Sequence, residues 1–419
     1  MSLSPASRTL LILASLNLLD YLDRYLIASL GSLVKAEMGL SDRAFGFLGT
    51  AFFLVYFLSS PIFGYLGDRF GRLRLMAGGA VLWSLATSLT FWVTSYSTLV
   101  LARGLVGVGE ASFGTLAPAY LADILPLNRR SRALGFFYLA LPVGSALAYL
   151  VGGLVGGRWG WRPAFLLAGI PGMLLAGLVL GLPGVVAGGR GAGEPVTKDS
   201  PGPALNHLTS LWTGARALWR LPTLRRVTLG YGMITFTLGG MAFWMPRYLE
   251  AAKGLEMAQA NYLLFGTVTV AGGLGTLAGG FLGDRLLKYT PKAPLLVSGL
   301  GVALSIPLVA LTIYARNPVY YVPGLVGAIF LLFLNPGVLT AVVVSVAGPG
   351  RRAQAVALNI VVIHLVGDVP SPFLIGWLAD LWGLKWGVSL TLVTLVAGAI
   401  LILKGMPHLS RDLEAAGEL

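Results

Sequence analysis

The stretch GYLGDRFGRLRL, residues 64–75, separates two long apolar runs. It holds three glycines, one acid and three arginines: Gly64, Gly67, Asp68, Arg69, Gly71, Arg72 and Arg74. The glycines allow close helix approach and a tight turn, the acid can accept hydrogen bonds at a helix terminus, and the arginines favour the cytoplasmic side. A near copy, GFLGDR, recurs at 280–285. The repeat predicts a duplicated chain in which each copy of this motif lies at the end of the second helix of one half.

Apolar runs continue from this stretch along the whole chain. Hydrophobic residues make up 56% of the 419 residues and charged residues 11%, with a mean hydropathy of +0.79. Soluble domains carry about 25% charged residues, and a membrane helix needs about 20 apolar residues. About twelve runs have such a length: 8–30, 44–67, 73–94, 98–124, 130–153, 162–186, 223–250, 259–283, 293–314, 319–345, 353–378 and 384–404. The sequence predicts an all-α integral membrane protein with about twelve transmembrane helices.

The apolar pattern is broken at 187–222 by the Gly- and Pro-rich stretch GGRGAGEPVTKDSPGP, which predicts a cytoplasmic linker. The segment that follows, HLTSLWTGARALWRL, has aromatic and basic residues at helical spacing. This favours an amphipathic helix on the membrane surface over a regulatory element. Six runs remain on each side, in 1–186 and in 223–419. We therefore predict two pseudo-symmetric six-helix bundles around one central cavity.

The distribution of positive charge predicts the orientation. The net charge is +13, and 20 of the 30 Lys and Arg fall in segments that one orientation assigns to the cytoplasm, against 8 on the other side. This asymmetry follows the positive-inside rule, so both termini are expected in the cytoplasm. The protein is expected in the inner or plasma membrane of the cell. It also removes the reason to expect a nucleic-acid partner. The chain has no cysteine, and its first run lacks the features of a removable signal peptide.

The stretch at 64–75 resembles the signature loop between helices 2 and 3 of the major facilitator superfamily. In that family the loop latches the cytoplasmic ends of the two halves, which implies gate roles for Asp68 and Arg72. The second copy supplies matching residues at Gly283, Asp284 and Arg285. However, Leu287 stands at the position of Gly71, so we expect the second latch to be weaker.

LVLARGLVGVGEA, residues 99–111, is similar to a second signature of the superfamily, an Arg-x-x-x-Gly-x-Gly pattern in helix 4. In the family this arginine, here Arg103, is associated with proton coupling. Glu110 follows two helical turns later on the same face, where a small residue is more usual.

A narrower resemblance rests on four further segments. GEASFGTLAPAYLADIL (109–125), FYLALPVGSALAYLVGG (137–153), HLVGDVPSPFLIGWLAD (364–380) and the opening LNLLDYLDRYLIA resemble the spinster-like subfamily in helices 4, 5, 11 and 1. Members of that subfamily carry lysolipids and sphingoid-type amphiphiles, which implies a substrate of this class.

Besides Arg8 at its start, the first apolar run contains three charges, Asp20, Asp23 and Arg24, at i, i+3 and i, i+4 spacing. A charge near mid-membrane costs at least ~2.5–3.5 kcal/mol, so such groups usually face a bundle interior or an aqueous cavity. One interpretation is a permanent ion pair, either Asp23–Arg24 or Glu110–Arg24. The other is proton coupling, because two or three acids around Arg24 and Arg103 leave an excess carboxylate. We predict coupling through Asp23 and Glu110, with Arg24, Arg103 and Asp20 in the same group.

Candidate substrate contacts combine polar residues with aromatic residues on cavity-prone helices: Asn17, Arg24, Tyr25, Phe113, Tyr138, Tyr231, Phe236, His364 and Asp368. His364 and Asp368 lie one turn apart in the eleventh run. They either contact substrate or bridge helices by a hydrogen bond. Pro370 and Pro372 follow directly and predict a kink.

These features favour a secondary transporter, proton-coupled and moving an amphiphilic substrate by alternating access. No HExxH, GxSxG or GxxxxGK[ST] motif occurs, so no enzyme activity, metal or other cofactor is expected. The alternatives are a multidrug/proton antiporter, a sugar transporter and a polytopic lipid-modifying enzyme. A sugar transporter is disfavoured because sugar sites need several amide side chains and glutamine occurs only at 259 and 354. The expected partners are membrane lipids, the substrate and protons, and the protein is expected to be a monomer.

Overall fold

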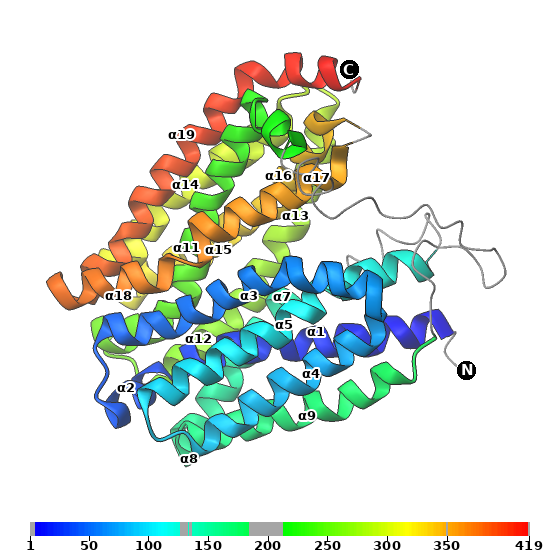
Figure 1. The fold of residues 1–419 in the computed structure, drawn as a ribbon. Coiled ribbons are helices and arrows are strands. Elements are labelled where there is room, and N and C mark those ends of the chain that lie inside the picture. Colours follow the sequence, from blue (N-terminus) through cyan, green and yellow to red (C-terminus); the bar gives the residue numbers. More distant parts are fainter. Residues whose placement is uncertain (1–4, 126–132, 134–135, 184–212, 349–350, 418–419) are drawn as a thin grey trace. The chain divides into compact units, whose positions relative to one another are not determined.

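The computed structural model describes residues 5–125, 133, 136–183, 213–348 and 351–417, which form helices and loops without strands (Figure 1). Among them are eleven helical segments long and apolar enough to span a membrane. In addition, α1 (Pro5–Ser29) has the length of a span and carries the charges Asp20, Asp23 and Arg24. The predicted all-α membrane fold is confirmed.

The chain forms two compact units, Met1–Val196 with Ala242–Thr269, and Thr197–Met241 with Val270–Leu419. The described helices of the first unit, besides α1, are α2 (Gly31–Met38), α3 (Asp42–Phe70), α4 (Arg72–Leu89), η1 (Thr90–Trp92), α5 (Tyr96–Ile124), α7 (Ala140–Val151), η2 (Gly152–Gly156), α8 (Gly157–Trp159), α9 (Arg162–Leu180) and α12 (Met257–Thr267). In this unit α4 packs against α5 and α9, α3 packs against α5, and α1 packs against α7 and α9. Small residues permit these approaches. For example, a Cβ added at Gly109 of α5 would lie 2.5 Å from the carbonyl oxygen of Gly79 of α4.

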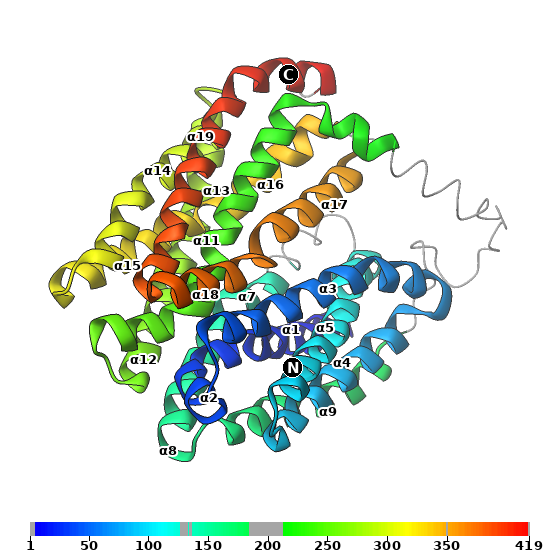
Figure 2. The same ribbon diagram turned by 60° about the vertical axis from the view of Figure 1, so that its left-hand side comes forward.

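The second unit repeats this arrangement (Figure 2). Its described helices include α13 (Gly273–Leu287), α14 (Ala293–Tyr314), α15 (Pro318–Phe333), α16 (Asn335–Ala347), α17 (Arg352–Ile363), η5 (His364–Asp368), α18 (Ser371–Trp382) and α19 (Leu384–Ala416). Here α14 packs against α15 and α19, as α4 does against α5 and α9, and α13 packs against α15 and α16. The recurring neighbours fit a duplicated chain.

Two helical runs pass from one unit to the other. α11 (Pro222–Lys253) crosses between Met241 and Ala242, and the π-helical segment η3 (Val268–Gly272) crosses after Thr269. The segment Ala242–Thr269, which the sequence assigns to 223–419, packs within the first unit. There Phe243 contacts Phe45, with ring centroids 4.9 Å apart, and Asn261 Nδ2 donates to Ser29 O at 2.9 Å. These contacts make the first unit larger than the predicted bundle 1–186.

Of three π-helical segments, η2 lies at the end of the predicted fifth run, and η3 and η5 lie within the eighth and the eleventh. Such segments often mark functional positions in helices. η5 contains His364 and Asp368 and ends just before Pro370, after which α18 begins at Ser371. The predicted irregularity beside this pair therefore takes the form of a π-helical segment.

The signature stretch at 64–75 forms the tight connection between α3 and α4. Gly71, with φ +89°, joins helices that end at Phe70 and begin at Arg72. The side chain of Asp68 lies outside the described residues. In the second copy α13 continues helically to Leu287, and the next residue, Lys288, keeps right-handed helical angles. A leucine in place of glycine is compatible with this continuation, because it disfavours a positive φ.

The linker prediction at 187–222 lies outside the described residues as far as residue 212. Beyond it, a helix covers 213–219 and has Leu218 fully buried and Arg216 exposed. Its position on a membrane surface stays a prediction.

Candidate functional site

Arg24 of α1 forms ion pairs with two acids from different helices. Its Nη2 donates to Asp20 Oδ2 at 2.9 Å, one turn earlier in α1. The same Nη2 donates to Glu110 Oε2 of α5 at 2.9 Å, and Nε donates to that oxygen at 3.1 Å. The exposed fractions of the three side chains are 10% for Arg24, 3% for Asp20 and 0% for Glu110. One guanidinium nitrogen therefore serves two buried carboxylates.

Aromatic rings surround the Arg24 guanidinium. Its central carbon lies 4.6 Å from the ring centre of Tyr21, 5.3 Å from that of Phe52 and 5.1 Å from that of Tyr56. Cation–π attraction strengthens when the cation is desolvated. These rings hold the guanidinium in an apolar setting while its nitrogens bind the acids.

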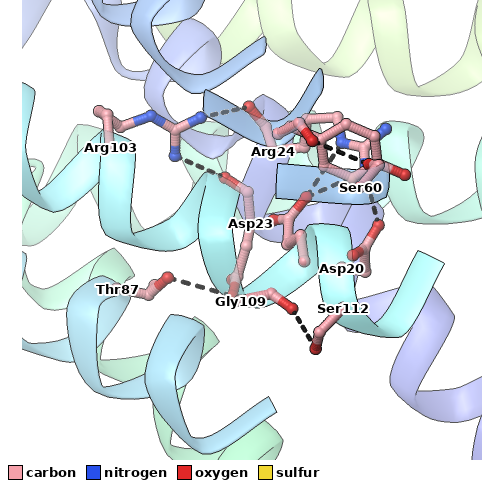
Figure 3. Close-up of polar contacts among 10 residues, drawn as sticks. Asp20, Asp23, Arg24, Ser60, Thr87, Arg103, Gly109 and Ser112 are labelled. Atoms are coloured by element: carbon pink, nitrogen blue, oxygen red, sulfur yellow. Dashed lines mark hydrogen bonds and ion pairs between the residues drawn. The ribbon is translucent and has the colours of Figure 1, made fainter. Parts of the chain in front are cut away.

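Arg103 of α5 binds the backbone of α1. Its Nη1 donates to Asp23 O at 3.4 Å and its Nη2 donates to Arg24 O at 3.3 Å (Figure 3). The guanidinium also lies over Phe52, at 4.9 Å, and the residue is 2% exposed. Arg103 thus fixes the part of α1 that carries Asp23 and Arg24.

Asp23 points to a different neighbour. Its Oδ2 accepts a hydrogen bond from Thr87 Oγ1 of α4 at 3.2 Å, and the residue is 1% exposed (Figure 3). Of the two ion pairs that the sequence left open, the structure forms Glu110–Arg24, whereas the Asp23 carboxylate binds Thr87. The three acids therefore separate into a pair at Arg24 and a third group beside α4.

The other predicted contact residues are spread over both units. In the first unit Phe113 is fully buried between Trp83 and Phe137, Asn17 donates to Phe137 O at 2.9 Å, and Tyr138 is 50% exposed. Tyr25 is partly exposed.

In the second unit His364 Nδ1 and Asp368 Oδ2 form a hydrogen bond of 2.5 Å. Phe236 is buried there and Tyr231 is partly exposed. The structure thus brings together the predicted proton-coupling residues within the first unit and the His364–Asp368 pair within the second.

Sequence reasoning missed Phe52, Tyr56 and Thr87. Phe52 and Tyr56 are four residues apart on α3, the spacing that places two rings on one helix face, but nothing in the sequence indicates that this face meets Arg24. A single threonine in an apolar helix, such as Thr87, does not indicate from the sequence alone that it binds a buried acid.

Comparisons with known proteins agree with this architecture. A family model for the Major Facilitator Superfamily matches residues 13–369. Protein spinster homolog 1 of Homo sapiens is 35% identical over 409 residues, which cover 92% of this chain and 76% of that protein. Protein spinster homolog 3 of Danio rerio is 33% identical over 390 residues, with coverages of 88% and 76%.

Solved structures show the same fold. A bacterial homologue of the human lysosomal transporter Spinster, in an inward-facing and unoccupied conformation, matches with a TM-score of 0.85 and 21% identity over 98% of this chain and 99% of that one. A D-xylose–proton symporter matches with a TM-score of 0.74 and 18% identity over 96% and 98%. The family model and the relatives identify the chain as a transporter and an integral membrane protein, not an enzyme. The protein belongs to the spinster family of the Major Facilitator Superfamily.

Proposed function

We propose that this transporter is a secondary, proton-coupled carrier of an amphiphilic lipid-like molecule of the lysophospholipid or sphingoid type. The observation that supports it most directly is the pair of buried carboxylates, Asp20 and Glu110, at one nitrogen of Arg24. One cation cannot neutralise two acids, and a buried, unpaired carboxylate is costly. We assign the proton to Glu110, with Asp23 as the second carrier. Protonation of these acids in one state of the transporter, and their deprotonation in another, would couple proton movement to transport.

The surroundings of Arg24 favour an amphiphile with a charged or polar head. A guanidinium in a cage of Tyr21, Phe52 and Tyr56 can exchange an internal carboxylate for an anionic head group, while rings accept the apolar part. Sugar sites need several amide side chains, and three of those present here are used internally: Asn17 and Asn335 donate to backbone carbonyls, and Gln259 caps α12. We therefore take the similarity to the sugar–proton symporter as a similarity of fold and do not propose a sugar substrate for this protein.

The proposed transport cycle is alternating access of the two halves in a cell membrane, and the working unit is a monomer. Both termini lie in the cytoplasm, and the motif at 64–75 acts as the cytoplasmic latch.

The deciding experiment uses purified protein in proteoliposomes with an imposed proton gradient. Labelled lysophospholipids, sphingoid bases, cationic drugs and xylose are compared. Accumulation of a lysolipid or sphingoid that collapses with the gradient supports the proposal. Accumulation confined to cationic drugs or to xylose contradicts the substrate class, and uptake insensitive to the gradient contradicts the coupling.

A further inference from the structure

Several buried polar atoms without protein partners belong to Asp23 of α1 and to residues of α4 near Thr87, the hydrogen-bond partner of Asp23. Within the described residues, Asp23 Oδ1, Trp83 Nε1, Ser84 Oγ and Ser88 Oγ have no hydrogen-bond partner. The four residues are at most 6% exposed. Leaving such a group unpaired in the interior destabilises the folded protein. Several of them at one place call for a polar ligand.

The residues that carry these atoms come from α1 and α4, and the contacts of both helices with α9 relate them to one another. Thr87, which binds Asp23, lies one turn from Trp83 and from Ser84 on α4, and Ser88 lies one turn beyond Ser84. The opposite wall is α9, which packs against both α1 and α4.

Two glycines of α9 leave the space that the hydroxyls occupy. A Cβ added at Gly169 would collide with Ser88 Oγ, and one added at Gly172 would collide with Ser84 Oγ and lie 3.8 Å from Trp83 Nε1. Close packing of small residues is common between membrane helices and would explain the serines alone. It does not explain the indole N–H or the carboxylate oxygen, because a buried tryptophan N–H usually has an acceptor.

The charges around Asp23 leave this side of its carboxylate neutral. On α1 the neighbours are Asp20 and Arg24, and on α5 they are Glu110 and Arg103, whose guanidinium binds backbone carbonyls of α1. α9 carries a single charged residue, Arg162, at its beginning, and the charges of α4 are at the opposite end from Thr87. A neutral donor and acceptor therefore fits this position better than an ion.

We propose that an ordered water site lies between α1, α4 and α9, bounded by Asp23, Trp83, Ser84, Thr87 and Ser88, and that Asp23 exchanges its proton through it. Water supplies both the acceptor that Trp83 Nε1 lacks and the donor that Asp23 Oδ1 lacks. The polar groups continue beyond Ser88, because the carbonyls of Phe91 and Val93 accept hydrogen bonds from the partly exposed Arg162. This assignment rests on the proposed proton coupling and adds a route for the proton along α4 and α9.

The water site is tested first by accessibility. Because the chain has no cysteine, Ser84→Cys and Ser88→Cys each introduce a single thiol. Silver ions, which are small and water-soluble, should react with both thiols in proteoliposomes and inhibit uptake. Ser305→Cys is the matched control, since Ser305 is fully buried and its hydroxyl donates to Val302 O at 2.7 Å. Reaction at 84 and 88 no faster than at 305 would overturn the water site.

The second test separates the route from the coupling itself. Ser84→Ala combined with Ser88→Ala should slow proton-driven uptake about tenfold, the effect of about 1.4 kcal/mol on a barrier. Gradient-free substrate exchange should be unchanged, which also shows that the variant folds, and Ser305→Ala should behave as wild type. If Asp23→Asn abolishes coupling while the double variant keeps the wild-type rate, the route is wrong and the proposed function stands. If Asp23→Asn and Glu110→Gln both keep coupling, the proposed function fails as well.

Discussion

Arg24 and Glu110, 86 positions apart in the sequence, meet through two hydrogen bonds to one carboxylate oxygen. Glu110 Oε1 has no partner within the described residues, so this acid has the capacity to hold a proton while its other oxygen stays on Arg24. The replacement of Glu110 by glutamine keeps the shape and an oxygen acceptor but removes the exchangeable charge.

Glu110→Gln should therefore retain substrate exchange and lose proton-driven accumulation. The pH dependence of substrate binding should flatten, because the titrating group is gone. Uptake and binding measured across a pH series test this, and Glu414→Gln, a change at an exposed acid in α19, is the control. Wild-type accumulation in Glu110→Gln would reduce the Arg24–Glu110 contact to structural pairing.

Arg24→Ala should destabilise the protein more than Glu110→Gln does. It leaves Asp20 and Glu110 buried without their cation, a loss of about 3–5 kcal/mol for a buried pair. Thermal unfolding in detergent measures the difference. Adding Asp20→Asn and Glu110→Gln to Arg24→Ala should recover part of the melting temperature, since the uncompensated charges are removed. A melting temperature that stays at the wild-type value in Arg24→Ala would show that the pair contributes little.

Asp68→Asn should weaken the proposed cytoplasmic latch and shift the protein toward inward-open states, with slower transport. A shift of this kind requires that Asp68 stabilise one state more than the other. Spin labels introduced through Tyr65→Cys and Tyr289→Cys, both at exposed positions, report the distance between the ends of α3 and α13. Identical distance distributions and normal transport in the variant would contradict the latch.

Glu37 forms a contact outside the membrane spans that should be lost at acidic pH. Hydrogen bonds from Arg162, together with one from Trp161, hold the pKa of Glu37 below its ordinary value of 4.5. Because the folded pKa is lowered, the contact stabilises the protein above the unfolded pKa and is lost as the pH falls through the folded value. The melting-temperature difference between wild type and Glu37→Gln should be present at pH 7 and shrink below pH 4.5. A difference that does not change with pH would contradict the role of ionised Glu37.

The proposed orientation places the linker and the loop before α15 on opposite sides of the membrane. Gly191→Cys, in the linker outside the described residues, should react with an impermeant thiol reagent only from the cytoplasmic side. Arg316→Cys should react only from the other side. Labelling of intact cells and of inverted vesicles compares the two, and reaction of both from the same side would contradict the orientation.

The sequence by itself determined the membrane helices and the local geometry of α1. Apolar runs of span length leave few alternatives to helices, because backbone groups in lipid must be satisfied within the segment. The i, i+4 spacing of Asp20 and Arg24 also places these two side chains on one face of the helix. The ion pairs considered from the sequence, however, were Asp23–Arg24 and Glu110–Arg24, and the Asp20–Arg24 pair is a finding of the structure. The repeated GYLGDR and GFLGDR likewise indicate a duplication without any coordinates.

Only the tertiary structure decided which acid from another part of the chain meets Arg24, and where Asp23 points. Contacts between helices depend on the rotation and depth of each helix, which are set by close approaches such as that of Gly79 and Gly109. The same reason explains why Thr87 was not foreseen and why Ala242–Thr269 packs with the first unit. Helical periodicity relates residues within one helix, whereas the packing of small side chains against other helices selects the partner.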